Sequence, residues 1–376
     1  MIRDAAEKFL AEASASAMVR DAMTRESGFD PGLWERIARD MGWCGTGIPE
    51  HHGGLGLGMV ELALLLEQMG RRLTCAPFFS TVCLAATALG EVADDAAQAH
   101  WLPRIAAGEL RATLAWASGG VAWDANALGA IASRVGSGWR LDGRFAHVPD
   151  GASAESIFVV ARIAGAQGDG EVGLFAVPAD AAGLERVPLS TWDATRRLAT
   201  LRLHGVELSG ACRLDDPART HDGLERTQAL AGLLLAAEQL GGAQHCLDIT
   251  LAYTAERVQF GQPIASFQAV KHRCAEMMVR IEATRSAVYG AAALAAGAPV
   301  TRELLMEAGS AKAQASDAFF HCAQEALQLH GGVGFTWEYD PHLYLKRAQA
   351  GSRWLGTPVQ WRERIAAALL DGRDGA

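Results

Sequence analysis

The chain has 376 residues, of which 50% are hydrophobic and 20% charged, so it is long enough for two or three packed units and too apolar to be disordered. Its formal net charge of −9 argues against nucleic acid as a partner, because phosphate binding needs a basic surface. The seven cysteines are scattered, and residues 1–10 carry acids where a leader peptide has an apolar run, which predicts a cytoplasmic chain with reduced thiols. No apolar run reaches the roughly 20 residues that span a bilayer, so no membrane partner is expected.

Residues 1–112 are predicted to form an N-terminal helical domain. Apolar residues recur at helical spacing over 33–41 and again over 60–69. The glycine-rich run Gly54-Leu-Gly-Leu-Gly58 lies between these two segments. Because it does not follow a strand of a βαβ unit, we interpret it as a connection between helices and not as a dinucleotide-binding loop.

Residues 113–215 change character and are predicted to form a central antiparallel β domain. Short runs of β-type residues occur at 113–116, 139–143, 156–162, 172–177 and 199–203. Each run is bounded by Gly, Asp, Pro or Ser, which are the residues that favour turns. Short strands separated by turns are typical of a small antiparallel β domain.

Residues 216–376 are predicted to form a C-terminal four-helix bundle, which makes the whole chain α+β. The helical period returns over 228–256, 266–294, 302–330 and 358–370. Long helices with short connections are typical of antiparallel bundles. The histidines of this region, His272, His321 and His330, do not have the spacing of a metal site, so we interpret them as packing or surface residues.

Two motifs in the predicted bundle are specific. Arg257-x-x-Phe260-Gly and then Phe-Gln268 follow the first helix, and Gln328-x-x-Gly331-Gly332-x-Gly-Phe-Thr ends the third. Together with Ile48-Pro-Glu-x-x-Gly-Gly and Trp101-Leu-Pro, they resemble the signature of the acyl-CoA dehydrogenases, in the same order and over essentially the whole chain. The resemblance implies α,β-desaturation of an acyl-CoA thioester with FAD, and an electron-transfer flavoprotein or a similar acceptor as a partner.

The motif residues suit a cofactor that carries a pyrophosphate. Arg257 is the candidate cation, and the absence of side chains at Gly331 and Gly332 lets the backbone approach the cofactor. In the family that the motifs resemble, these residues reach across a dimer interface to the flavin of the neighbouring subunit. The predicted cofactor-binding residues are Arg257, Phe260, Gln268, Gln328, Gly331, Gly332 and Thr357.

The catalytic carboxylate that the resemblance implies is missing. Removal of the α proton needs a base, which the family places either just before a Gly-Thr pair or on the first bundle helix. Here those two positions hold Leu355 and Ala231. Glu238, two helical turns beyond Ala231, remains open either as a relocated base or as a structural carboxylate. Glu338 does not match the family's base position.

The predicted β domain departs from the family as well. The stretches 114–119 and 146–149 lack the hydroxyls and the aromatic ring that the resemblance places against a flavin ring. The chain has thus lost what it would supply to its own site and kept what it would supply to a neighbour's flavin. This pattern predicts a subunit of a mixed assembly, whose partner is a homologous acyl-CoA dehydrogenase subunit.

The run 334–347 points to one subgroup within the family that the motifs resemble. It is similar to the actinobacterial heterotetrameric dehydrogenases that act on bulky CoA thioesters, including steroid side chains. Two alternatives remain. The first is an active homotetramer that uses Glu238, and the second is a scaffolding paralogue that binds neither flavin nor substrate. The retained Arg257 and Gln328 speak against the second alternative.

Overall fold

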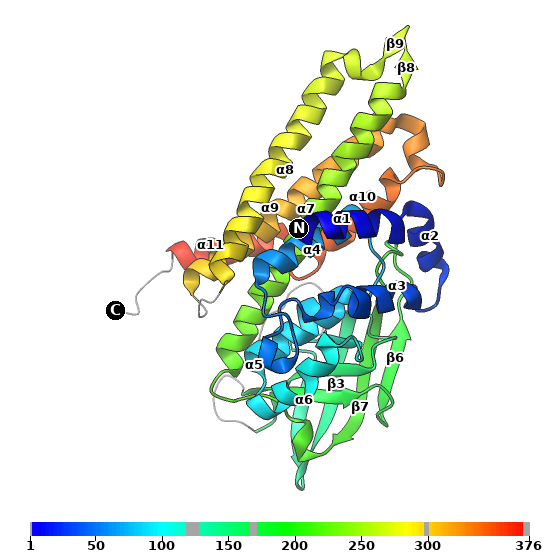
Figure 1. Ribbon diagram of the computed structural model, residues 1–376. Helices are drawn as coiled ribbons and strands as arrows, with labels where there is room; N and C mark the ends of the chain where they lie inside the picture. The colour runs from blue at the N-terminus through cyan, green and yellow to red at the C-terminus, as the bar shows by residue number, and fades with distance from the viewer. Residues whose placement is uncertain (1, 118–127, 166–170, 297–300, 371–376) are drawn as a thin grey trace. The chain divides into compact units, whose positions relative to one another are not determined.

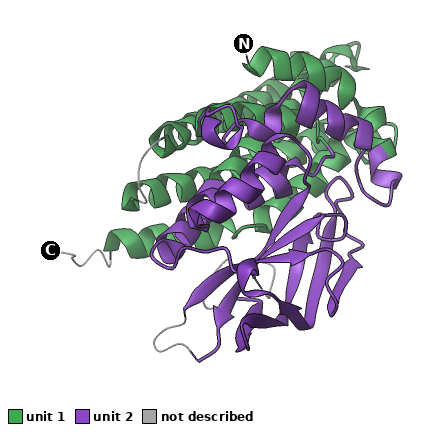
Figure 2. Cartoon of the chain, turned by 60° about the horizontal axis from the view of Figure 1, so that its bottom comes forward, with its two compact units in different colours: residues 1–21, 59–74, 232–376 green, residues 22–58, 75–231 purple. Residues whose placement is uncertain are grey.

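The computed structural model describes residues 2–117, 128–165, 171–296 and 301–370. Contacts divide the chain into two compact units, each assembled from separated segments (Figure 2). Unit 1 holds residues 1–21, 59–74 and 232–376, and unit 2 holds residues 22–58 and 75–231. The long helix α7 (Thr220–Glu256) passes from unit 2 into unit 1 between Ala231 and Gly232.

Unit 1 is built of helices (Figure 1). Besides the larger part of α7, it contains α1 (Ile2–Ala13), the start of α2 (Ser16–Thr24), α4 (Met59–Arg71), α8 (Gln268–Ala295), α9 (Arg302–His330), α10 (Pro341–Arg353) and α11 (Pro358–Leu370). A two-stranded hairpin of β8 (Val258–Gln259) and β9 (Gln262–Pro263), followed by the short helix η7 (Ile264–Ser266), joins α7 to α8. Helix α10 adds to the four bundle helices expected from the sequence, and it starts with Pro341 in its first turn.

Helices α4 and α7 cross at two glycines. A Cβ atom added at Gly70 would stand 1.9 Å from the backbone oxygen of Glu238, and one added at Gly241 would stand 1.8 Å from that of Glu67. Backbone atoms cannot move aside as a flexible side-chain end can. The crossing therefore depends on having no side chain at either position.

We expect Gly241→Ala to destabilise the protein, because the added methyl group meets backbone that is fixed in another helix. The cost should be at least the 1–3 kcal/mol typical of an overpacked core. Gly290→Ala is the matched control, since Gly290 lies in α8 with nothing within 4 Å of an added Cβ. The control should gain about 0.5–1 kcal/mol from helix propensity. Equal urea midpoints for the two variants would contradict this account of the crossing.

Unit 2 is centred on a seven-stranded sheet. Its strands are β1 (Ala112–Ala115), β2 (Ala130–Val135), β3 (Gly138–Pro149), β4 (Ser156–Ile163), β5 (Val172–Pro178), β6 (Leu184–Pro188) and β7 (Leu198–Leu208). The order is β1-β4-β2-β3-β7-β6, and β5 pairs with β4. The buried core of the sheet includes Trp139, Phe145 and Phe175.

The sheet is mixed, and the expected purely antiparallel pairing is corrected on this point. Strands β1 and β2 both run parallel to β4, while the other pairs are antiparallel. Parallel neighbours need a long connection that returns the chain to the same end. The alternation of apolar residues carries no information about pairing direction, so the sequence did not reveal it.

The helical part of unit 2 consists of short segments, two of which are π-helical. The segment expected at 33–41 is a short helix α3 (Pro31–Glu35) that continues as a π-helical stretch η1 (Arg36–Asp40). The further segments are η2 (Trp43–Gly45), η3 (Glu50–His52), the π-helical η4 (Phe79–Ala86), α5 (Thr87–Val92) and α6 (Asp95–Ala106). Every residue of η4 is buried, and the Thr81 hydroxyl donates to the Ala112 carbonyl of β1.

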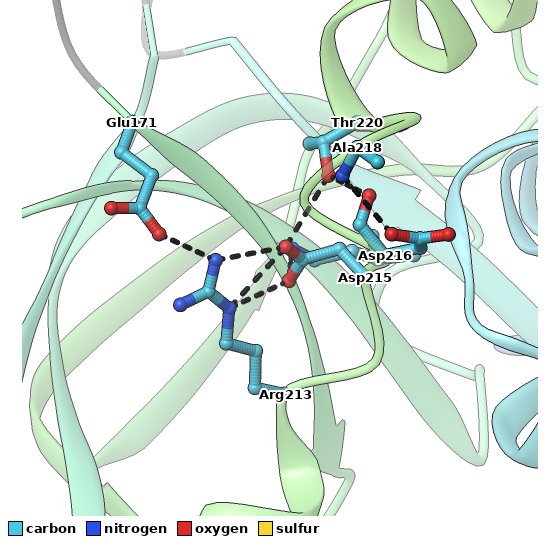
Figure 3. A network of polar contacts seen from close by, with 7 residues as sticks. Glu171, Arg213, Asp215, Asp216, Ala218 and Thr220 are labelled. Carbon is cyan, nitrogen blue, oxygen red and sulfur yellow. Dashed lines mark hydrogen bonds and ion pairs between the residues drawn. The ribbon is translucent and has the colours of Figure 1, made fainter.

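A polar network fixes the segment that leads from β7 to α7 (Figure 3). The short helix η6 (Gly210–Cys212) follows β7, and the next residue, Arg213, bonds Asp215 at 3.0 Å and Glu171 at 2.7 Å. Asp215 also accepts a hydrogen bond from the Leu174 amide of β5 at 3.0 Å. Its other oxygen lies 3.3 Å from the hydroxyl of Thr220, the first residue of α7. The network thus ties the start of the long helix to the sheet within unit 2.

Candidate functional site

Six of the seven predicted cofactor-binding residues lie at one end of unit 1. Arg257 follows the last turn of α7, and Gln268 begins α8. Phe260 and Gly261 form the turn between β8 and β9, and both have positive φ, of 54° and 79°. The Phe260 ring is 92% exposed, although a left-handed conformation costs a residue with a side chain about 1–2 kcal/mol. An exposed aromatic ring on a strained turn indicates a contact surface.

The end of α9 supplies the remaining residues of this group. Gln328 lies in the last turn of α9, and Gly331 ends the helix with φ of 64°. A Cβ atom added at Gly331 or Gly332 would meet nothing within 4 Å. The backbone of the glycine pair, at the start of the short helix η8 (Gly331–Phe335), is therefore open to a ligand.

Two contacts hold the motif segments together. The ring of Tyr253, one turn before Arg257, stacks on His330 with centroids 4.3 Å apart. Arg273 of α8 bonds Glu325 of α9 at 3.1 Å. The ends of α7 and α9 and the start of α8 therefore lie side by side.

The polar side chains at this end fit a ligand with a diphosphate. Arg257, Gln268 and Gln328 are exposed, and their side chains make no hydrogen bond or ion pair with any residue that the structure describes. An unpaired guanidinium at the same end of unit 1 as an exposed glycine pair offers a cation to phosphate oxygens, and the glycines leave room for the ligand. The donor set at this end of unit 1 matches what the pyrophosphate of FAD requires.

Thr357 lies elsewhere and has a structural contact. Its hydroxyl accepts from the Gln360 amide at 3.2 Å, and its own amide donates to Gln360 Oε1 at 2.8 Å. This reciprocal pair is a capping box at the start of α11. Gly356, which precedes Thr357, and Gly309 of α9 both contact Trp361. Gly309 lies about 28 Å from Gln328 along the axis of α9. The structure does not bring Thr357 to the other six residues.

Both positions at which the family places its base are apolar and buried. Ala231 is 0% exposed and Leu355 is 1% exposed. Leu355 has φ of 57°, and its carbonyl accepts a hydrogen bond from Trp361 Nε1 at 3.0 Å. The indole of Trp361 rests against Gly232, Gly309 and Gly356, where an added Cβ would come within 3.3 Å of the ring. Sequence reasoning missed this packing, because the three glycines come from distant segments.

Glu238 lies in a buried ion pair. Arg347 Nη1 of α10 donates to Glu238 Oε1 at 2.8 Å, and both side chains are less than a tenth exposed. This buried ion pair between a carboxylate of α7 and a guanidinium of α10 holds the two helices together. The geometry favours the structural interpretation of Glu238 that the sequence left open. Glu338, by contrast, is exposed.

Lys312 is a buried amine that the sequence analysis overlooked. Its Nζ atom donates to Ser316 Oγ at 2.7 Å and to the Gly351 carbonyl, near the end of α10, at 3.2 Å. Burial lowers the pKa of Lys312 to about 7, against the opposing influence of the Asp317 carboxylate. The signal was present in the sequence, because small apolar residues occupy the same face of α9 at Ala308 and Ala315.

The two β-domain stretches that the resemblance associates with a flavin ring are neighbours in unit 2. Thr113 of β1 donates to the carbonyl of Pro149 at the end of β3, at 2.6 Å. The backbone pairing of β3 with β7 is irregular between Phe145 and Val148, where His147 has φ of 57°. Trp116 is buried next to β1, and residues 118–119 of the first stretch lie outside the described residues.

The remaining expectations concern metals and membranes. Among the described residues, no three His, Cys, Asp or Glu side chains lie close enough together to hold a metal ion. His330 is stacked in the bundle, His321 lies 3.8 Å from Glu276, and His272 is exposed. Within the same residues, every helix is too short or too polar to cross a membrane.

Comparisons with known proteins agree with the motifs. Residues 1–109 match the model of the acyl-CoA dehydrogenase N-terminal domain, and residues 229–370 match that of the C-terminal domain. The acyl-CoA dehydrogenase IpdE2 of Mycobacterium tuberculosis is 34% identical over 377 residues, which cover 99% of this chain and 97% of the relative.

Two solved structures are similar over the whole chain. One is a variant of the Tcur3481–Tcur3483 steroid ACAD, with a TM-score of 0.87 and 33% identity, covering 99% of this chain and 97% of that one. The other is the ChsE4–ChsE5 complex from Mycobacterium tuberculosis, with a TM-score of 0.88 and 26% identity, covering 100% and 97%. The motifs, the fold and the relatives agree, and the chain belongs to the acyl-CoA dehydrogenase family, whose members are oxidoreductases.

Proposed function

We propose that this chain is the subunit without a catalytic carboxylate in a cytoplasmic, heteromeric, FAD-dependent acyl-CoA dehydrogenase that acts on bulky CoA thioesters such as steroid derivatives. The desaturation removes a proton from the α carbon and a hydride from the β carbon of the acyl group. FAD, when bound, accepts the hydride, and an electron-transfer flavoprotein or a similar acceptor reoxidises it. The homologous partner subunit supplies the base and the β domain that holds the flavin ring.

One observation carries this proposal. The two base positions, Leu355 and Ala231, are apolar and buried. The Arg257 side chain and the glycine pair are exposed, and a Cβ added at either glycine would meet nothing within 4 Å among the described residues. A chain that acted alone would need a base in contact with its substrate. A chain that completes a neighbour's site needs an exposed cofactor-binding end, and here that end also exposes Phe260, Phe335 and Trp337.

The substrate class and the mixed assembly have support from relatives. A relative at 33% identity is named a steroid ACAD, and a relative at 26% identity was solved as a complex of two differently named subunits. Genes for such subunits are expected side by side. Co-expression with the neighbouring homologue is therefore the direct test, read out as flavin content and as reduction of an artificial acceptor by a steroid CoA thioester.

Arg257→Ala should weaken FAD binding to the assembled complex by roughly ten- to hundredfold, because a charge-assisted hydrogen bond contributes about 1.5–3 kcal/mol. Fluorescence titration of the apo complex with FAD measures the change. Arg302→Ala is the control, since this exposed arginine starts α9 at the end away from the glycine pair. An unchanged FAD affinity in Arg257→Ala would remove Arg257 from the site.

The rival function, a homotetramer that uses Glu238 as its base, makes the opposite prediction for Glu238→Gln. We expect the complex with Glu238→Gln to keep most of its rate. Its stability should fall, because the buried guanidinium of Arg347 loses its ion pair with the Glu238 carboxylate. Glu276→Gln is the matched control, since its pair with Arg280 is exposed to solvent and should contribute little to stability. Loss of turnover at unchanged stability would favour the rival.

A further inference from the structure

Both ends of the loop that carries the glycine pair contact the same aromatic ring, that of Tyr253. The loop leaves α9 after His330, and the chain returns at Tyr339, just before α10. Tyr253 of α7 stacks on His330 at 4.3 Å with an interplanar angle of 19°. Tyr339 meets both Tyr253 and His330 edge-on, with each pair of centroids 6.1 Å apart. Tyr253 is therefore the common contact of both ends of the loop.

The orientation of the stack is fixed by further bonds. His330 Nδ1 donates to the Ala326 carbonyl at 2.7 Å, which fixes the ring orientation and the tautomer. Burial lowers the pKa of His330, against the opposing influence of its hydrogen bond to the Ala326 carbonyl, and so favours the neutral ring. On the other side of the stack, the Arg257 amide donates to the Tyr253 carbonyl at 2.9 Å, one helical turn along α7. Each member of the stack is thus directly connected to a predicted cofactor-binding group.

The contact between the rings sets the spacing of the two groups that would hold a diphosphate. Arg257 is one turn from Tyr253, and Gly331 follows His330 directly. Stacked aromatic rings contribute about 0.5–1.5 kcal/mol beyond their buried area and hold a defined geometry. A leucine in place of Tyr253 would retain apolar burial but would not define the separation of α7 from the loop.

We infer that Tyr253 is a positioning residue for flavin binding: its stack on His330 holds the Arg257 guanidinium and the Gly331–Gly332 backbone in register for one diphosphate. This role rests on the proposed function. In this role Tyr253 acts through the two groups that it holds together and not by binding the cofactor itself. The ring is required and the hydroxyl is not, because no hydrogen bond of the Tyr253 hydroxyl exists among the described residues.

The test uses the complex of this chain with its homologous partner and FAD as the probe. Tyr253→Leu should weaken FAD binding about tenfold, and Tyr253→Phe should bind as wild type does. The double variant Tyr253→Leu, Arg257→Ala should bind within about threefold of Arg257→Ala alone, because coupled residues do not add. If Tyr253 had only a structural role, the losses of FAD affinity in Tyr253→Leu and Arg257→Ala would multiply in the double variant.

The results distinguish a failure of the proposed function from a failure of the positioning role of Tyr253. A wild-type complex that binds no FAD would overturn the proposed function. A wild-type complex that binds FAD, together with a Tyr253→Leu complex of equal affinity or with multiplicative losses in the double variant, would overturn the positioning role alone. If Tyr253→Leu does not assemble, His330→Leu replaces it, since it removes the other ring of the same stack. Unchanged FAD affinity in His330→Leu would equally overturn the role.

Discussion

Purified alone and supplied with FAD and an acyl-CoA, the chain should turn over at least about 10²–10⁴-fold more slowly than the complex with its homologous partner, because general-base catalysis contributes that factor. The complex should contain about one flavin for each pair of chains. Absorbance of the flavin, the protein concentration and reduction of an artificial electron acceptor measure both quantities. The matched control is a complex whose partner has its own base replaced by glutamine, which should be as inactive as the lone chain.

Restoring a carboxylate to this chain should not rescue the lone subunit. Leu355 is 1% exposed, and Trp361 donates a hydrogen bond to its carbonyl. A glutamate at 355 would be buried beside the indole, where an unpaired carboxylate is unfavourable. Leu355→Glu is therefore expected to lower stability without producing turnover. Activity of the lone chain that Glu238→Gln abolishes would show that this subunit is catalytic, and the central proposal would be wrong.

Lys312→Met should stabilise the protein near pH 6.5, and this advantage should disappear by about pH 9.5. The folded chain holds the Lys312 pKa at about 7, against an ordinary value of 10.5. Between these values the unfolded chain binds the extra proton, so the stability of the native protein rises with pH across this window. Below pH 7 both states are protonated, and the native state carries the full cost of a buried ammonium, on the order of 5 kcal/mol.

The hydrogen bonds of Lys312 that are lost in Lys312→Met lower the stability of the variant and oppose this gain. Methionine leaves the Gly351 carbonyl and Ser316 Oγ without their donor, which costs about 1–2 kcal/mol at every pH. The net gain at pH 6.5 should be a few kcal/mol, and the difference should fall to zero or reverse at pH 9.5. Urea unfolding of both proteins at the two pH values measures it. Lys271→Met, at an exposed position on α8, removes the same charge and is the control. A gain that does not change with pH would contradict the buried-amine account.

Residues close together in sequence determined much of what was predicted. The helical period alone places α9 at Arg302–His330 and α11 at Pro358–Leu370, because amphipathic spacing is a local property. The Arg257 and Gly331–Gly332 motifs were sufficient for the family, and the absence of a carboxylate at Leu355 is visible in one residue. These features depend only on residue identity and on spacing along the chain.

Only the tertiary structure decided the remaining points, because they depend on contacts between distant segments. The ion-pair partner of Glu238 is Arg347, which lies 109 residues away along the chain and 2.8 Å away in space. Lys312 is buried only once the fold brings the Gly351 carbonyl of α10 to within 3.2 Å of its amine. The parallel pairing of β1 with β4 depends on the path of the chain between the two strands. The rings of Tyr253 and His330 stack although 77 positions separate them in the sequence, and stacking free energy exists only once the fold has brought the rings together.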